Sequence, residues 1–108
     1  MDSKTVRTLE DIRNAILEIK TFFGTRPMRY DVYLSDVCLR RAVERNISII
    51  GEAMNRLHKF APDIEFSSTH SILEICNSNY DKVTNDMMWG IVIGHLPLLK
   101  AEVEKMLK

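Results

Sequence analysis

The sequence is poor in residues that break helices and in residues that form disulfides or metal sites. It has four glycines and three prolines among 108 residues, too few for the many tight turns of an all-β fold. Its two cysteines, Cys38 and Cys76, match neither a metal-ligand spacing nor a disulfide framework. We therefore expect a reducing, cytoplasmic location and no metal or other cofactor.

Net charge and long apolar runs are also missing. Fifteen basic and fifteen acidic side chains cancel, so the chain has no overall basic surface for nucleic acid, and any RNA contact would be local. The longest uncharged stretch, residues 87–99, is shorter than the ~20 residues of a membrane-spanning helix. The start of the chain leads into no apolar run, so we expect neither a signal peptide nor a membrane anchor.

Helical periodicity is the main signal in the sequence. Apolar residues make up 45% of the chain and recur at three- and four-residue steps, with no strand-like alternation. The predicted helices cover 6–23, 35–60 (with Ser35 and Asp36 as caps), 69–76 and 84–107 (with Thr84 as cap), the last kinked or restarted at Pro97, and 25–34 is predicted to be a connection. We expect one all-α domain over residues 1–108, an up-and-down antiparallel bundle of four to five helices.

Asn46 interrupts the apolar stripe of the second predicted helix. A buried amide needs hydrogen-bond partners. Asn46 is therefore either a satisfied structural residue of a core or interface, or part of a functional site.

The fourth predicted helix carries more apolar surface than one buried face requires. Its apolar residues cover roughly two-thirds of the helix circumference, whereas a bundle helix needs a stripe little wider than 100°. They are Met87, Met88, Trp89, Ile91, Val92, Ile93 and Leu96. Gly90 and Gly94 would permit close approach on the remaining side. This pattern predicts a homodimer seam, or alternatively a central helix wrapped by the other three.

The residue types alone reveal no enzyme. His58, His70 and His95 have no partner at metal-binding spacing, and His95 is more typical of a structural histidine. No Ser-His-Asp pattern, glycine-rich phosphate loop or carboxylate pair is present.

The order of the segments resembles a known family. Residues 42–53, AVERNISIIGEA, resemble the central helix of the HepT-like members of the HEPN superfamily, and residues 80–100 are similar to that family's closing helix. The resemblance implies an all-helical, HEPN-like homodimer. It also implies a metal-independent RNA endonuclease that acts as the toxin of a toxin–antitoxin pair, with a minimal nucleotidyltransferase as partner.

The family's active motif is an Arg, four residues, a His, one residue and a Tyr, commonly with an Asn after the Arg. The Arg can hold a phosphate bidentately, the His can move the proton of a ribose hydroxyl, and the Tyr is the residue that the partner modifies with AMP. Residues 73–80, LEICNSNY, occupy this window. Tyr80 matches the Tyr, but Leu73 stands at the Arg position, Ser78 at the His position and Glu74 at the Asn position.

The resemblance therefore implies a degenerate active site. We expect catalysis to be lost, while dimerisation, nucleotidyltransferase binding and weak RNA or nucleotide contact are retained, with Asn46, Glu52 and Glu74 in binding or supporting positions. The alternative is an active ribonuclease that uses displaced residues. Its candidates are His70 and the cluster of Arg40, Arg41 and Arg45.

Overall fold

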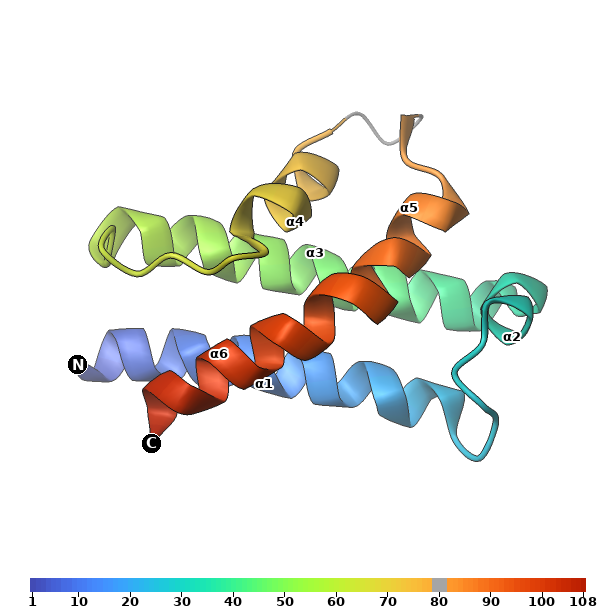
Figure 1. Cartoon of the computed structure of the whole chain (residues 1–108), viewed down its shortest axis with the longest axis horizontal. Helices are drawn as coiled ribbons and strands as arrows, with labels where there is room; N and C mark the ends of the chain where they lie inside the picture. Colours follow the sequence, from blue (N-terminus) through green and yellow to red (C-terminus); the bar gives the residue numbers. More distant parts are fainter. Residues whose placement is uncertain (79–81) are drawn as a thin grey trace.

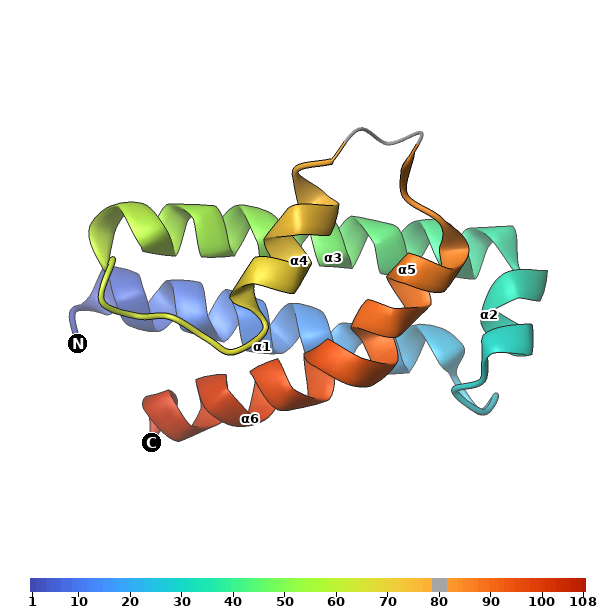
Figure 2. The same ribbon diagram turned by 45° about the horizontal axis from the view of Figure 1, so that its top comes forward.

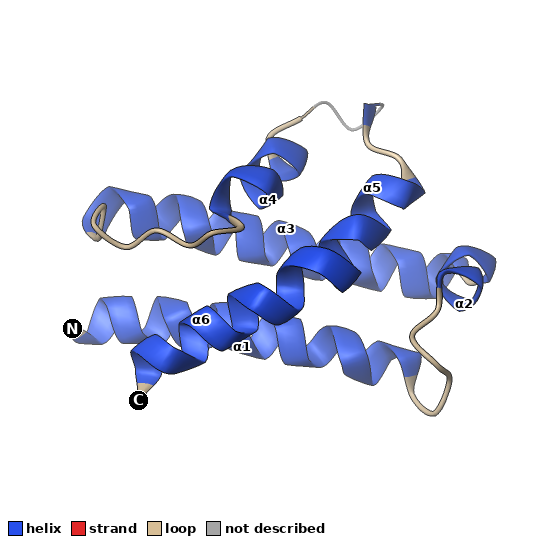
Figure 3. Ribbon diagram, viewed as in Figure 1, coloured by secondary structure: helices blue, strands red, loops and turns tan. Residues whose placement is uncertain are grey.

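Helices are the regular structure of the described part of the chain. The computed structural model describes residues 1–78 and 82–108, and within these ranges it contains no strand (Figures 1 and 3). The elements are α1 (Ser3–Phe23), α2 (Tyr30–Ser35), α3 (Val37–Phe60), α4 (Thr69–Cys76), α5 (Asn85–Gly90), the π-helix η2 (Ile91–His95) and α6 (Leu96–Leu107). Because α5, η2 and α6 follow one another without a break, they form one helical segment, and the predicted all-α bundle of four to five helices is confirmed.

The long helices α1 and α3 run antiparallel and form one layer (Figure 1). Asp2 begins α1, since its carboxylate accepts a hydrogen bond from the Thr5 amide at 2.8 Å. Gly24 ends α1 with a φ of 62°, a conformation that favours glycine. The predicted end of this helix at Phe23 is confirmed.

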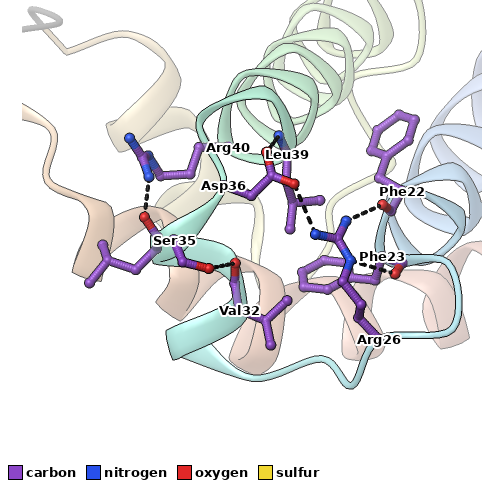
Figure 4. A network of polar contacts seen from close by, with 9 residues as sticks. Phe22, Phe23, Arg26, Val32, Ser35, Asp36, Leu39 and Arg40 are labelled. Atoms are coloured by element: carbon purple, nitrogen blue, oxygen red, sulfur yellow. Dashed lines mark hydrogen bonds and ion pairs between the residues drawn. The ribbon is translucent and has the colours of Figure 1, made fainter.

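Arg26 ties the end of α1 to the start of α3 (Figure 4). Its guanidinium donates to the carbonyl oxygens of Phe22 and Phe23, both at 3.1 Å, and to the Asp36 carboxylate at 2.8 Å. Asp36 also accepts from the Leu39 amide at 3.1 Å and so caps α3, as predicted. One arginine thus fixes the turn between the two longest helices.

The short helix α2 lies inside the segment that the sequence predicts to be a connection. Six residues are too few to show helical periodicity, and the packing of α2 depends on a residue far along the chain. The rings of Tyr30 and Tyr33 lie 6.1 and 5.2 Å from that of Trp89 in α5. The prediction of a plain connection over 25–34 is therefore wrong, because tertiary aromatic packing stabilises a helix there.

The second layer consists of α4 and the α5–η2–α6 segment, which crosses the α1–α3 pair obliquely (Figures 1 and 2). The Thr84 hydroxyl accepts from the Met87 amide at 3.2 Å and caps α5, as predicted. Pro97 cannot donate a backbone hydrogen bond, and its ring would clash with the carbonyl of Ile93 in a regular helix. The chain responds with the wider π-turn at 91–95 and resumes α-helix at Leu96. The predicted irregularity at Pro97 is thus a π-turn just before the proline, after which the α-helix resumes in the same continuous segment.

The core lies between the two layers. Its largest fully buried apolar side chains come from α1, α2, α3, α4 and α6. They are Leu9, Ile12, Ile19, Phe23, Tyr33, Val43, Ile47, Ile50, Ile72, Leu99 and Val103. None of the described helices is long and apolar enough to cross a membrane.

Candidate functional site

The helix that carries the motif window, α4, packs closely on α3. A Cβ atom at Gly51 would lie 2.5 Å from the Cys76 Sγ and 2.8 Å from its Cβ, so α4 could not take this position beside a larger residue. The Cys76 thiol donates to the Ile47 carbonyl at 3.5 Å. Burial raises the pKa of this thiol, and the nearby Glu52 carboxylate raises it further. Gly51 therefore sets the distance between α3 and the motif helix.

A groove of about 490 Å³ lies between the C-terminal half of α3, the loop 61–68 and α4. We call it the α3–α4 groove. Its apolar lining comprises Met54, Leu57, Pro62, Ile64, Phe66 and Leu73, and its polar lining comprises Asn55, His58, Glu65, Thr69, His70, Glu74 and Asn77. Leu73, at the position of the family's Arg, is half-buried and packs against the core. An apolar contact thus lies where the resemblance implies a phosphate-binding group.

The charged groups of the α3–α4 groove are acidic. Glu65 and Glu74 are exposed, and the described residues that line the groove include neither Lys nor Arg. His70 Nε2 lies 3.4 Å from the Glu74 carboxylate. Because phosphates carry the same sign of charge as the two carboxylates, the groove disfavours an RNA backbone.

Ser78, at the position of the family's His, does not share this groove. It lines a separate hollow of about 60 Å³ between α3, α4 and the start of α5. Ser78 lies two residues beyond the end of α4, and its hydroxyl donates to the Glu74 carbonyl of that helix. A serine hydroxyl without an adjacent base cannot accept a proton near neutral pH. Tyr80 lies outside the described residues.

Asn46 faces α1 and the core. It is 3% exposed, and its amide nitrogen donates to the Ala15 carbonyl and to the Glu18 carboxylate, both at 3.0 Å. These are the partners that a buried structural amide requires. Glu52 is exposed on α3, on the side that meets Cys76. Arg45 is exposed and is not among the residues that line the groove.

The histidines separate into two kinds. His95 Nδ1 lies 3.1 Å from the hydroxyl of Ser68, which is 1% exposed, so His95 has a structural partner, as the sequence suggested. His58 shares the α3–α4 groove with His70, although the sequence assigned it no role. One feature of the sequence indicates that His58 lies near His70: the short loop 61–68 brings the last turn of α3 beside the first turn of α4. Among the described residues, no group of three or more His, Cys, Asp or Glu could hold a metal ion.

Comparison with known proteins identifies the family of the chain. The profile of the ribonuclease HepT-like family matches residues 12–106. A Methanocaldococcus jannaschii protein named as an RNase is 29% identical over 114 residues, covering 100% of this chain and 92% of the relative. A Thermococcus cleftensis protein named as a ribonuclease HepT is 32% identical over 104 residues, covering 93% of each chain. No solved structure matches the chain. The chain thus belongs to the HepT-like ribonuclease family.

Proposed function

We propose that this member of the HepT-like family acts by binding and does not cleave RNA. The observation that carries the proposal is which residues stand at the Arg and His positions of the motif, and what those residues contact. Leu73 packs as an apolar residue in an acidic groove. The Ser78 hydroxyl lines a different hollow and bonds to the Glu74 carbonyl of α4. Neither a phosphate-binding cation nor a proton acceptor stands where the family's chemistry requires one.

The rival proposal, a ribonuclease with displaced residues, has less support. His70 does line the groove, but its ring nitrogen faces the Glu74 carboxylate, and Arg45 does not line it. A phosphate held near His70 would lie beside that carboxylate without a cation in the groove lining to offset the repulsion.

We further propose that the chain forms a homodimer through the outer face of the α5–η2–α6 segment. Ile93 is 50% exposed and Met87 is 41% exposed. At Gly90 and Gly94, a Cβ atom would meet no described atom within 4 Å beyond its chain neighbours and the backbone of its own helix. The other helices of the described chain leave this face open, and small residues among exposed apolar ones let a second copy approach closely.

The remaining parts of the proposal rest on the family. A nucleotidyltransferase partner and a role beside it in a toxin–antitoxin pair are what the resemblance of residues 42–53 and 73–100 implies. A cytoplasmic location is proposed from the cysteine content. The two free thiols support a reducing compartment.

Restoring the missing groups tests the proposal. The variant L73R/S78H should gain cleavage of a tRNA pool that the wild-type chain lacks. The control L34R/S35H makes the same two replacements at exposed positions of α2 and should stay inactive. Circular dichroism would establish that both variants remain helical. Cleavage by the wild-type protein at catalytic concentration would overturn the proposal.

A further inference from the structure

We infer that the α3–α4 groove is a docking site for a basic, amphipathic segment of a partner protein. The inference rests on the proposed function, because it names the chemistry of the partner that a binding protein of this kind would take. The groove lies on one side of α4, and its volume of about 490 Å³ is sufficient for several side chains.

The floor of the groove supplies the apolar contact. Three buried side chains, each at most 6% exposed, line the floor: Met54 and Leu57 of α3 and Phe66 of the loop. Leu73 and Ile64 are half-buried beside them. Apolar side chains of a partner, and the aliphatic stems of Lys or Arg, would lose contact with water on this floor.

The rim supplies the charge that selects a basic partner. Glu65 comes from the loop and Glu74 from α4, so the carboxylates belong to two separate walls of the groove. The Glu74 side chain is 69% exposed beside His70. A guanidinium lying on the apolar floor could bond a carboxylate bidentately, whereas an acidic segment would meet repulsion from both sides.

The same groove explains why a polyanion is disfavoured. In the family the position of Leu73 carries a cation that holds phosphate, and here that position is part of the floor. Its neighbour Glu74 adds negative charge. The apolar Leu73 and the acidic rim therefore act together: the helix at the position of the family's motif presents an apolar, acid-rimmed surface.

The test uses a short synthetic helix with leucines on one face and arginines on the other, and a twin peptide with glutamates in place of the arginines. Binding to the full chain is followed by fluorescence anisotropy, and amide chemical shifts locate the site. The arginine peptide should bind and shift the amides of the groove residues, and the glutamate twin should not. The variant E65K/E74K should weaken binding by about tenfold or more.

A matched variant separates a local from a general charge effect. E10K/D11K makes the same change in net charge on α1 and should leave the affinity of the arginine peptide within about twofold of wild type. Equal losses in both variants, no binding of the arginine peptide, or groove shifts produced by an oligouridylate would overturn the inference. Incubation of the same samples with RNA distinguishes failure of the proposed function from failure of the docking site. Cleavage refutes the proposed function, whereas intact RNA without peptide binding refutes the docking site alone.

Discussion

At the scale of single residues, buried polar groups determine which parts of this chain are structural. Asn46 and Ser68 are each almost fully buried, and both have partners: Asn46 bonds to α1, and Ser68 contacts His95. Groups of this kind cost several kcal/mol when left unpaired. The burial of Asn46 and Ser68 therefore needs no catalytic explanation.

We predict that Asn46→Asp destabilises the protein more than Asn46→Ala. Alanine removes two hydrogen bonds and should lower the free energy of unfolding by about 1–3 kcal/mol. Aspartate puts a buried carboxylate beside the Ala15 carbonyl and the Glu18 carboxylate, so the loss should reach about 3 kcal/mol or more. Urea denaturation measures both. Asn14→Ala, at an exposed position of α1, is the control. An Asn46→Asp variant as stable as wild type would show that Asn46 is not a core residue.

Asp36 links stability to pH. The Arg26 guanidinium, and next the Leu39 amide, hold the pKa of this carboxyl below its usual value. A lowered pKa in the folded state means that the stabilisation is complete above the unfolded pKa of about 3.9 and is lost as pH falls through the folded pKa. Asp2 and Asp31 also have lowered pKa values, for the same kind of reason.

The urea midpoint of the wild-type protein should therefore fall between about pH 5 and about pH 2. Asp36→Asn removes one of the responsible groups, so its midpoint should fall less over this range. An identical fall in both proteins would contradict the role of Asp36 in joining α1 to α3.

At the scale of elements, the contact between α3 and α4 depends on a missing side chain. Glycine normally costs about 1 kcal/mol relative to alanine inside a helix, yet Gly51 is buried in the middle of α3. The reason is the Cys76 side chain of α4, which occupies the space that a Cβ would take.

Gly51→Ala should consequently destabilise the fold, despite the better helix propensity of alanine. Overpacking at this contact should lower the free energy of unfolding by about 1–3 kcal/mol. Ser48→Ala, at an exposed position of the same helix, should stay within about 0.5 kcal/mol of wild type. A Gly51→Ala variant more stable than wild type would contradict the close approach of the two helices.

The elements also show what the sequence could predict. The bounds of α4 and the end of α3 follow from periodicity and from residues that come just after each helix, Asn77 after α4 and Pro62 after α3. The helix α2 does not, because its packing requires Trp89, and the π-turn η2 does not, because it depends on how the chain accommodates Pro97. His70, Leu73 and Glu74 are predictable as neighbours on one helix.

For the other wall of the groove, the short loop 61–68 indicates only that the end of α3 lies near the start of α4, and not which side chains face each other. His58 and Glu65 belong to α3 and to the loop, and their meeting with α4 depends on the packing at Gly51. Periodicity gives the face of a helix but not the neighbour against which that face packs.

At the scale of the whole molecule, the open apolar face of α5–η2–α6 predicts a dimer. Sedimentation at micromolar concentration should report twice the monomer mass. Ile93→Lys places a charge on this face, at a half-exposed apolar position. It should weaken association by about tenfold or more, with unchanged circular dichroism. Leu34→Lys, at an exposed apolar position of α2, should leave the dimer intact. A wild-type chain that sediments as a monomer would contradict the predicted seam.

The central claim is that this HepT-like chain binds without cleaving, and the direct measurement is incubation of the purified wild-type protein with a tRNA pool, analysed on a denaturing gel. The account predicts intact RNA at protein concentrations at which L73R/S78H produces discrete fragments. Discrete fragments from the wild-type protein, abolished by His70→Ala, would contradict the account and establish a ribonuclease with displaced catalytic groups.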